Sequence, residues 1–490
     1  MPDFLIQTRD QKYEIKIKLY DPSGQEYNAE SFAVEALCLE ESLQEWQVKG
    51  FIVFAMRYEV LEKSKIYTIR HDSRNRVNLQ IKPLGGEWDP TYGHMNFDCV
   101  IYDIEDIPHT DPLNKLRKFY IIDERYQFFK ERNIEWSTAW WSKDERKKKN
   151  SSRKEWTHFS PDVKDYKKSM RANRALKALI LSAGSKYFDP NAPDIFIGGT
   201  LLGKIGSWDD GGYSNRIFYT SPSNFSVLDD IRYVSNNISS KSGSPVFLRY
   251  GRTTESKSWS LISLHDILKT ANDNQIERIQ LLDTISRDGL PYIPRAPENS
   301  FASPIASVIN TYKLAHMSAM DADRITNKAL HHYNFATNQY NIYQDENSAA
   351  ATLLKAHEYA EELYGYKKSK QLLINLNKAK TAGYIQQHIL SPMNFIQTTK
   401  LQQDMIHDIF LLNQGLFFQT AGLTLRQPGK FVFVDKNDSH DNNPFDDKFL
   451  GQWLITKVTH MFTRTTYSND VLLVKADSFS RVWRETDEKE

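Results

Sequence analysis

The segment 429–477, close to the end of the chain, constrains the fold most because its apolar residues are arranged for strands. The stretches 430–434, 453–462 and 471–476 are rich in β-branched and aromatic residues and lack helical spacing. Clusters of Asn, Asp and Gly separate them, which is typical of turns. The segment therefore predicts a β-meander and not an active site.

The beginning of the chain carries a second group of predicted strands. In the stretch 13–19 apolar and charged residues alternate, which places the apolar set on one face of a half-solvated strand. The sequence Asp-Pro-Ser-Gly at 21–24 predicts a turn after it. Residues 40–43, Glu-Glu-Ser-Leu, are expected to form a polar corner. The other strands predicted in this region are 33–39, 51–54, 77–81, 97–102 and 118–122.

Both ends of the chain resemble the baseplate central hub protein of contractile-tailed bacteriophages, whose fold is shared with the late control protein D and type VI secretion spike families. At the C-terminal end the resemblance lies in 425–429, Leu-Arg-Gln-Pro-Gly, and in the meander. At the N-terminal end it lies in the order strand, acidic-Ser-Leu corner, loop, Gly50 and strand. The resemblance implies an α+β fold in which two antiparallel β-barrel tube domains bracket an α/β insertion domain.

The middle of the chain is expected to form the insertion. The basic, polar run 143–154 cannot bury apolar surface and indicates a domain boundary. Helices are predicted over 170–183, with Gly184 as a terminator, and over 223–238. A hairpin is predicted from 246–250 and 259–264.

The C-terminal half mixes expected helices with a Pro-rich connector at 291–304. Further helices are predicted at 275–285, 349–364 and 398–412, the last feeding a strand at 415–425. The predicted domains are a first barrel at 1–135, an inserted α/β domain at 136–271, a second barrel at 272–484 and a charged tail at 485–490.

Composition limits the classes of partner and compartment. The 490 residues carry a formal net charge of +1, so nothing attracts the whole chain to nucleic acid or to an anionic membrane. Two cysteines, Cys38 and Cys99, are too few for a disulfide framework or a four-ligand zinc site, and are expected to be buried thiols in a reducing compartment. The most apolar segment, 175–183, is far shorter than the roughly 20 residues that span a bilayer.

A glycine-rich segment, 198–204, has the spacing of a phosphate-binding loop up to Lys204. Ile205 then occupies the position where a Ser or Thr hydroxyl would bind Mg²⁺, and glycines follow where a helix should begin. A flexible loop is the favoured interpretation. A nucleotide-binding enzyme that uses this loop is retained as an alternative.

Neither metal nor catalytic chemistry is predicted at the remaining candidates. The acidic loop 435–447 has His440 where a calcium loop needs Gly, so a solvated loop is favoured over an ion site. The adjacent residues His331 and His332 diverge on a helix or a strand, and His357 has an ordinary helical neighbour in Glu361. The predicted site residues are therefore catalytic none, cofactor-binding none and metal none, with no cofactor.

The basic residues of 146–171 leave a nucleic-acid-binding module as another alternative, although acidic residues interrupt the run. The favoured interpretation is a surface loop. The sequence identifies no role for the basic segment 143–154 or for the segment 271–395.

By resemblance, the chain is a non-enzymatic structural subunit of the virion tail baseplate that assembles in the host cytoplasm. It would form a homotrimer, a pseudo-sixfold ring that joins the tail tube to a trimeric central spike protein. Other implied partners are tube-initiator or tape-measure proteins, other baseplate proteins, and DNA that passes without sequence recognition; no membrane insertion is implied. The hub of another tail type and a secretion-system spike base are alternatives. Trp453, Phe462 and Tyr467 are expected in a barrel core or a subunit contact, with the core favoured.

Overall fold

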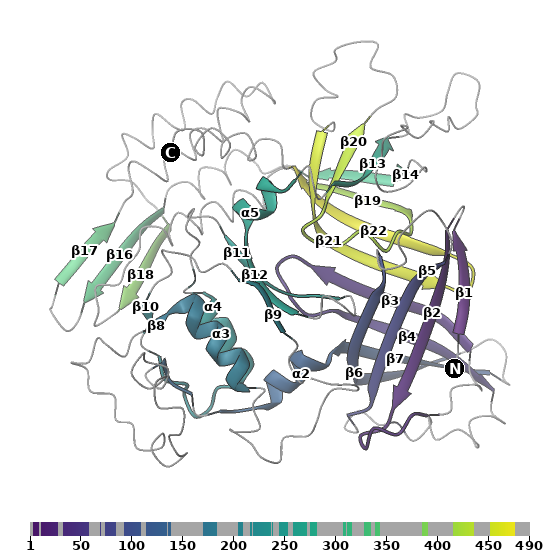
Figure 1. Ribbon diagram of the computed structural model, residues 1–490, viewed down its shortest axis with the longest axis horizontal. Helices are drawn as coiled ribbons and strands as arrows, with labels where there is room; N and C mark the ends of the chain where they lie inside the picture. The colour runs from purple at the N-terminus through teal and green to yellow at the C-terminus, as the bar shows by residue number, and fades with distance from the viewer. Residues whose placement is uncertain are drawn as a thin grey trace, which may run out of the picture.

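The computed structural model shows a mostly antiparallel β protein with few helices and a curled, half-barrel sheet (Figure 1). The structure describes residues 3–8, 11–27, 33–57, 69, 74–84, 93–108, 114–134, 136–138, 170–183, 204–208, 216–217, 219–236, 238, 245–252, 258–271, 275–281, 307–309, 311–315, 328–334, 339–343, 385–390, 415–435 and 451–475.

Fourteen strands from the two ends of the chain form the large sheet. Its N-terminal strands are β1 (Asp3–Thr8), β2 (Gln11–Tyr20), β3 (Ala33–Ser42), β4 (Lys49–Arg57), β5 (Arg76–Leu84), β6 (Met95–Ile107) and β7 (Asn114–Asp123). Its C-terminal strands are β13 (Gln275–Leu281), β14 (Ser307–Ile309), β15 (Thr311–Ala315), β19 (Gly415–Ala421), β20 (Phe431–Asp435), β21 (Gly451–Thr463) and β22 (Tyr467–Lys475). The main path runs β1-β2-β5-β6-β7-β4-β3-β21-β20-β13-β14, and β22 connects β21 to β19 and β15.

Strands β3 and β21 join the two ends of the chain into this one sheet. They pair antiparallel from Ser42 with Lys457 to Ala36 with Thr463. In Figure 1 the purple and blue N-terminal strands and the yellow C-terminal strands lie side by side along this seam. Residues that lie far apart in the sequence therefore share one continuous ladder of backbone hydrogen bonds.

The N-terminal strands follow the predicted alternation. Tyr13, Ile15, Ile17 and Leu19 of β2 are buried, while the charged residues between them are partly exposed. At Gly50 the backbones of β3 and β4 approach so closely that a Cβ atom would lie 1.9 Å from the carbonyl oxygen of Cys38. This close approach explains the need for glycine at the position that contributes to the resemblance.

Two apolar cores lie against the large sheet. The first is built mainly from β2 to β7, and it also takes in Phe462 and Tyr467 from the C-terminal hairpin. The second contains Trp453 and neighbouring residues of β19 to β22. Phe462 is fully buried and stacks on Tyr467 at 4.0 Å, so the expectation that these aromatic residues are core residues is confirmed.

A third core holds the middle of the chain together, with helices α3 and α4 packed near α2 and beside a small sheet (Figure 1). The elements are α2 (Glu124–Glu131), β8 (Met170–Arg171), α3 (Ala172–Ala183), β9 (Lys204–Trp208), β10 (Arg216–Ile217), α4 (Val227–Ser235), β11 (Val246–Tyr250), β12 (Ser258–Ser263) and α5 (Leu264–Lys269). The predicted hairpin is confirmed as β11 and β12, to which β9 adds in parallel. A separate sheet contains β16 (Lys328–Asn334), β17 (Gln339–Tyr343) and β18 (Ile385–Leu390).

Two sequence predictions are wrong in kind. The segment 275–285 was expected to be helical, but β13 pairs in parallel with β14 and β20, so sheet pairing overrides the local spacing of its apolar residues. The polar corner at 40–43 begins inside β3, where Glu40, Glu41 and Ser42 pair with β21.

Other predictions differ in extent or lie outside the described residues. Helix α4 begins at Val227, after an N-terminal cap and capping box at Ser226, and ends at Ser235. Strand β19 ends at Ala421, earlier than predicted. The described residues do not include 143–154, Gly184 or the helices predicted at 349–364 and 398–412.

Candidate functional site: a buried polar junction

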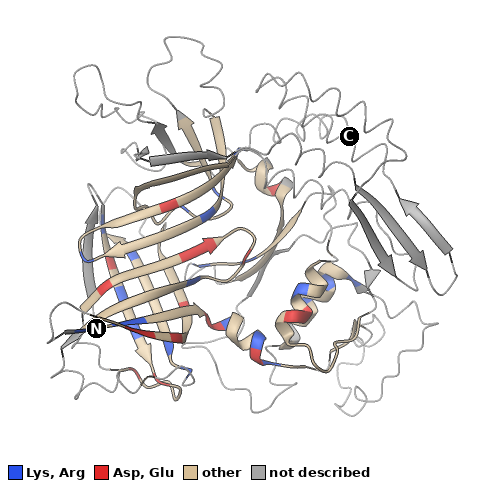
Figure 2. Ribbon diagram, turned by 180° about the vertical axis from the view of Figure 1, so that it is seen from behind, with Lys and Arg blue, Asp and Glu red and all other residues tan. Residues whose placement is uncertain are grey.

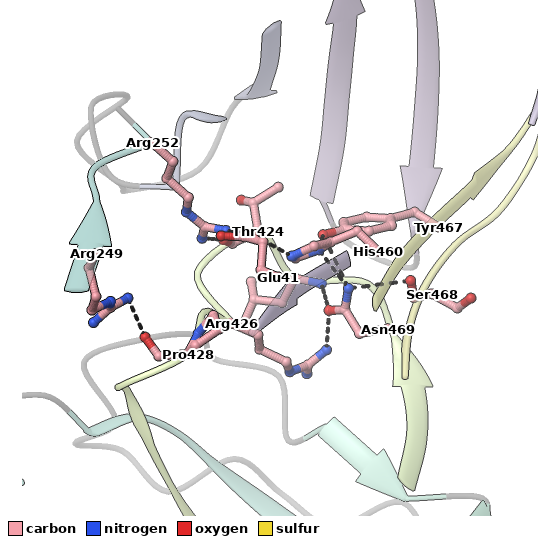
Figure 3. A network of polar contacts seen from close by, with 11 residues as sticks. Glu41, Arg249, Arg252, Thr424, Arg426, Pro428, His460, Tyr467, Ser468 and Asn469 are labelled. Carbon is pink, nitrogen blue, oxygen red and sulfur yellow. Dashed lines mark hydrogen bonds and ion pairs between the residues drawn. The ribbon is translucent and has the colours of Figure 1, made fainter. Parts of the chain in front are cut away.

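Charged and polar side chains meet in the interior where three distant segments of the chain come together (Figure 3). Glu41 comes from β3, and Arg252 follows β11. The other members are Thr424, Arg426, His460, Tyr467 and Asn469, which lie between β19 and β20 or on β21 and β22. We call these seven residues the junction.

An ion pair connects the first and middle segments of the chain. A guanidinium nitrogen of Arg252 donates to Oε1 of Glu41, 211 residues away, and another donates to the carbonyl oxygen of Thr424. The two charged side chains are only 6% and 13% exposed. Burial opposes the charge on Glu41, but Arg252 and His460 outweigh it and lower the pKa of this carboxyl. Glu41 is therefore ionised, and it lies between Arg252 of the middle segment and His460 of the C-terminal hairpin.

His460 continues the network from Glu41 into the C-terminal hairpin. Its Nε2 lies 3.2 Å from Oε1 of Glu41, and its Nδ1 accepts from Nδ2 of Asn469 at 2.9 Å. The hydroxyl of Tyr467 lies 2.8 Å from the same Nδ1. Burial and the nearby arginines lower the pKa of His460 more than Glu41 raises it. This pattern assigns the neutral ring with the proton on Nε2, where it donates to Glu41.

Arg426 completes the junction on the side of the turn that precedes β20. Its buried guanidinium donates to the carbonyl oxygen of Ala421 at 2.5 Å and to Oδ1 of Asn469 at 2.9 Å. The same Asn469 oxygen accepts from the backbone of Leu423 at 2.7 Å. Arg426 belongs to the segment 425–429 that contributes to the resemblance. Its contacts with Ala421 and Asn469 give one structural reason for an arginine at this position.

A second buried charged cluster attaches helix α2 to the first core. Asp123 caps the helix and binds Arg125 at 2.5 Å, and the guanidinium of Arg125 lies 3.7 Å from the centre of the Tyr250 ring. Burial raises the pKa of Glu124 to about 8, although Arg76 lies 3.8 Å away. The middle of the chain is thus fixed to the N-terminal strands by polar as well as apolar contacts.

The arrangement of the junction suits a structural role. The carboxylate of Glu41 contacts Arg252 and His460. Both ring nitrogens of His460 have hydrogen-bond partners, Glu41 at Nε2 and Asn469 at Nδ1. Within the described ranges, no group of three or more His, Cys, Asp or Glu residues could hold a metal ion. No helix in the described part of the chain is long and apolar enough to cross a bilayer.

The candidates from the sequence are not brought together. Lys204 begins β9, while the rest of the 198–204 loop lies outside the described residues. His331 and His332 are neighbours in β16, and Asp435 ends β20 before the undescribed part of its acidic loop.

The two cysteines are free and buried, as predicted. Burial raises the pKa of the Cys38 thiol to about 11 and that of Cys99 well above its ordinary value. Both thiols are therefore protonated and poorly reactive near neutral pH.

None of the seven junction residues was predicted from the sequence to form a polar site. They are separated by long stretches of chain, and charged residues in a strand normally indicate a solvated face. The available signal was the apolar setting of Asn469 and His460 inside the predicted meander, since a buried polar side chain needs partners.

Comparison with known proteins gives structural neighbours but no assigned family. No protein-family model matches the chain, and no curated protein matches it. The solved structures similar to it include a tail protein from Neisseria meningitidis MC58, with 8% identity, a TM-score of 0.48 and coverage of 95% of this chain and 98% of that one. A 43 kDa tail protein of prophage MuSo2 from Shewanella oneidensis has 8% identity, a TM-score of 0.46 and coverage of 95% and 99%. A component of the type VI secretion system of E. coli has 9% identity, a TM-score of 0.40 and coverage of 95% and 78%.

Proposed function

We propose that the protein is a structural hub subunit of a phage contractile-tail baseplate. Three copies form a pseudo-sixfold ring that joins the tail tube to the central spike and leaves a channel for DNA. Each copy supplies two tube domains, one from each end of the chain, and the middle of the chain forms the inserted domain. The chain acts as a part of the assembly and not as an enzyme.

The pairing of β3 with β21 is the observation that supports this proposal most strongly. It places two curled groups of strands side by side in one sheet, although they come from opposite ends of the sequence. A subunit with two neighbouring sheet units is what a threefold ring needs to present six similar positions. The sequence resemblance lies in the same two regions.

The junction supports the proposal because it would hold the paired segments in a fixed relative orientation. Glu41, Arg252 and His460 tie the N-terminal strands, the middle segment and the C-terminal hairpin at one point. Polar contacts of this kind depend on direction, so they fix the relative orientation of the segments more tightly than apolar packing does. A ring subunit needs this rigidity because small errors in angle accumulate around the ring.

The surface fits a chain that works among protein neighbours. Acidic and basic residues are interspersed over the curled sheet and no single sign dominates it (Figure 2). The proposed neighbours are two sister copies, the trimeric spike, the tube-initiator or tape-measure proteins and other baseplate proteins in the virion tail. DNA passes through the ring without sequence recognition.

Electron microscopy of the purified protein mixed with the product of its neighbouring spike gene tests the proposal. We expect threefold particles with six similar lobes around an open centre, capped on one side by the spike. Particles that contain a single copy, or a ring closed at its centre, would contradict it.

A further inference from the structure

A small cavity lies beside the junction, where several segments of the chain meet. Its volume is about 40 Å³. Its walls come from the end of β3 and the loop after it, the start of β6, the end of β7 with the start of α2, the end of β11 with the residues that follow, and Pro428. A space of this size holds roughly three water molecules. Its charged lining residues are Glu41, Glu45, Asp123, Arg125, Arg249 and Arg252.

Three guanidinium groups line the cavity, and they are not balanced equally. Arg125 pairs with Asp123, and Arg252 pairs with Glu41. Arg249 donates to the carbonyl oxygen of Pro428 at 2.5 Å, and within the described part of the chain it has no carboxylate partner. Because a guanidinium carries five N–H donors, this contact leaves most of its hydrogen-bonding capacity for another acceptor.

The electrostatic environment of Arg249 favours an added negative charge. Burial lowers the pKa of Arg249 to about 10, since the opposing effect of Glu41 is too small and Arg252 adds a second positive charge. Burial, Arg249 and Arg252 also lower the pKa of nearby Lys430. A partly buried cation without a carboxylate bound to it is unfavourable, and an anion placed against Arg249 would relieve it.

We infer that this cavity binds one carboxylate group, held by Arg249 and flanked by Arg125 and Arg252. The planar fork of an arginine matches the two oxygens of a carboxylate, and the space of about 40 Å³ fits a group of three heavy atoms. It is too small for a nucleotide. The carboxylate comes either from a small organic acid or from an acidic side chain of another polypeptide.

Glu45 at the edge of the cavity provides an independent way to change the affinity. It is exposed and pairs with Lys49 at 3.0 Å, and its negative charge repels an approaching anion. The substitution Glu45→Gln removes this charge at the surface without opening the core. It therefore tightens carboxylate binding, about two- to fivefold for a partly screened charge.

The test is thermal unfolding of the full chain in sodium formate and in sodium chloride at equal ionic strength. Formate should raise the melting temperature in a saturable way beyond chloride. The substitution Arg249→Gln should weaken the apparent formate affinity about tenfold or more, as for the loss of a charged hydrogen bond. Arg232→Gln is the matched control, because Arg232 is exposed on α4 and does not line the cavity.

The inference would be overturned if formate did not stabilise the wild type. It would also be overturned if formate stabilised the wild type and Arg249→Gln equally. If Arg249→Gln does not fold, Glu45→Gln provides the test. A formate affinity that this substitution leaves unchanged or weakens would then overturn the inference. A capped peptide that carries one Asp separates the two sources. Stabilisation by formate and by this peptide identifies a site for acidic side chains, whereas stabilisation by formate alone identifies a site for small acids. Neither outcome depends on the proposed function.

Discussion

The two ends of the chain share one sheet but have different interiors. The N-terminal strands bury Asn78, Asn96 and Asp98 beside the apolar first core, and the hydrogen bonds of Asn78 to Asn96 at 3.0 Å and to Asp98 at 2.7 Å stay between the neighbouring strands β5 and β6. The C-terminal strands bury His460, Asn469 and Arg426 together with their apolar residues. Both regions therefore combine apolar burial with directed polar contacts, but the polar contacts of the C-terminal hairpin also cross to Glu41 of β3.

This difference shows how the two regions are matched to each other. Phe462 and Tyr467 extend from the C-terminal hairpin into the first core, so apolar packing spans the seam. On the same hairpin His460 contacts Glu41 of β3, so a polar contact spans it too. Apolar and polar contacts therefore both connect the two ends of the chain across the seam.

The largest effect is expected from the apolar contact across the seam. Phe462→Ala should lower the free energy of unfolding by about 4 kcal/mol, because it removes a fully buried aromatic side chain and leaves a cavity. Leu472→Ala is the control, since Leu472 is 39% exposed on the neighbouring strand and should cost about 0.5 kcal/mol or less. Urea unfolding measures both. Equal losses would contradict the place of Phe462 in the first core.

A somewhat smaller loss is expected from the polar contact. Glu41→Gln should cost about 3 kcal/mol, because it leaves the buried guanidinium of Arg252 without its counter-charge. The next residue, Glu40, offers a matched control: it pairs with Lys49 and Lys457 near the surface, and Glu40→Gln should cost at most about 1 kcal/mol. If both variants unfold at the same urea concentration, the junction does not orient the two halves.

Close packing at Gly422 sharpens the comparison further. A Cβ atom at this position would lie 2.1 Å from the Tyr467 ring, so Gly422→Ala must displace a side chain that belongs to the first core. We expect a loss of about 2 kcal/mol from overpacking. Near-ultraviolet circular dichroism should report the displaced tyrosine, and an unchanged spectrum with unchanged stability would contradict the proposed contact.

The smallest effect is a dependence of stability on pH that arises in the junction. The pKa of His460 is lowered, so the unfolded chain binds a proton near pH 6.5 before the folded chain does. The pKa of Glu41 is also lowered, and its contribution is lost at still lower pH. His460 therefore lowers the stability as the pH falls from 7 to 5, whereas Glu124, whose pKa is raised to about 8, acts in the opposite direction. The contribution of His460 should appear as a difference in slope between the wild type and His460→Asn over this pH range. An identical slope in the variant would exclude His460 as the titrating group.

The apolar parts of both regions could be predicted from the sequence because their alternation is local. The strand at 13–19 and the meander at the C-terminal end were predicted on this basis, and β2 and β20 to β22 confirm them. The segment 275–285 misled the prediction because its strand state comes from pairing with β20, which no local pattern encodes.

The junction could not be predicted because its chemistry depends on long-range contacts. Glu41 follows another glutamate and looks like part of a solvated corner, but it lies within β3, which pairs with β21, and its side chain contacts Arg252 and His460. Its partner Arg252 lies in a different region of the chain, and nothing in the local sequence connects the two. Sequence resemblance at 425–429 drew attention to the turn without assigning a role to Arg426.

The proposed ring is the central claim, and multi-angle light scattering tests it most directly. The chain should contribute three times its 57.0 kDa, either when it is purified alone or within the complex that forms after its spike protein is added. Disruption of the seam by Phe462→Ala should reduce the trimer fraction, while Leu472→Ala should leave it unchanged. A mass of one chain under both conditions would contradict the account.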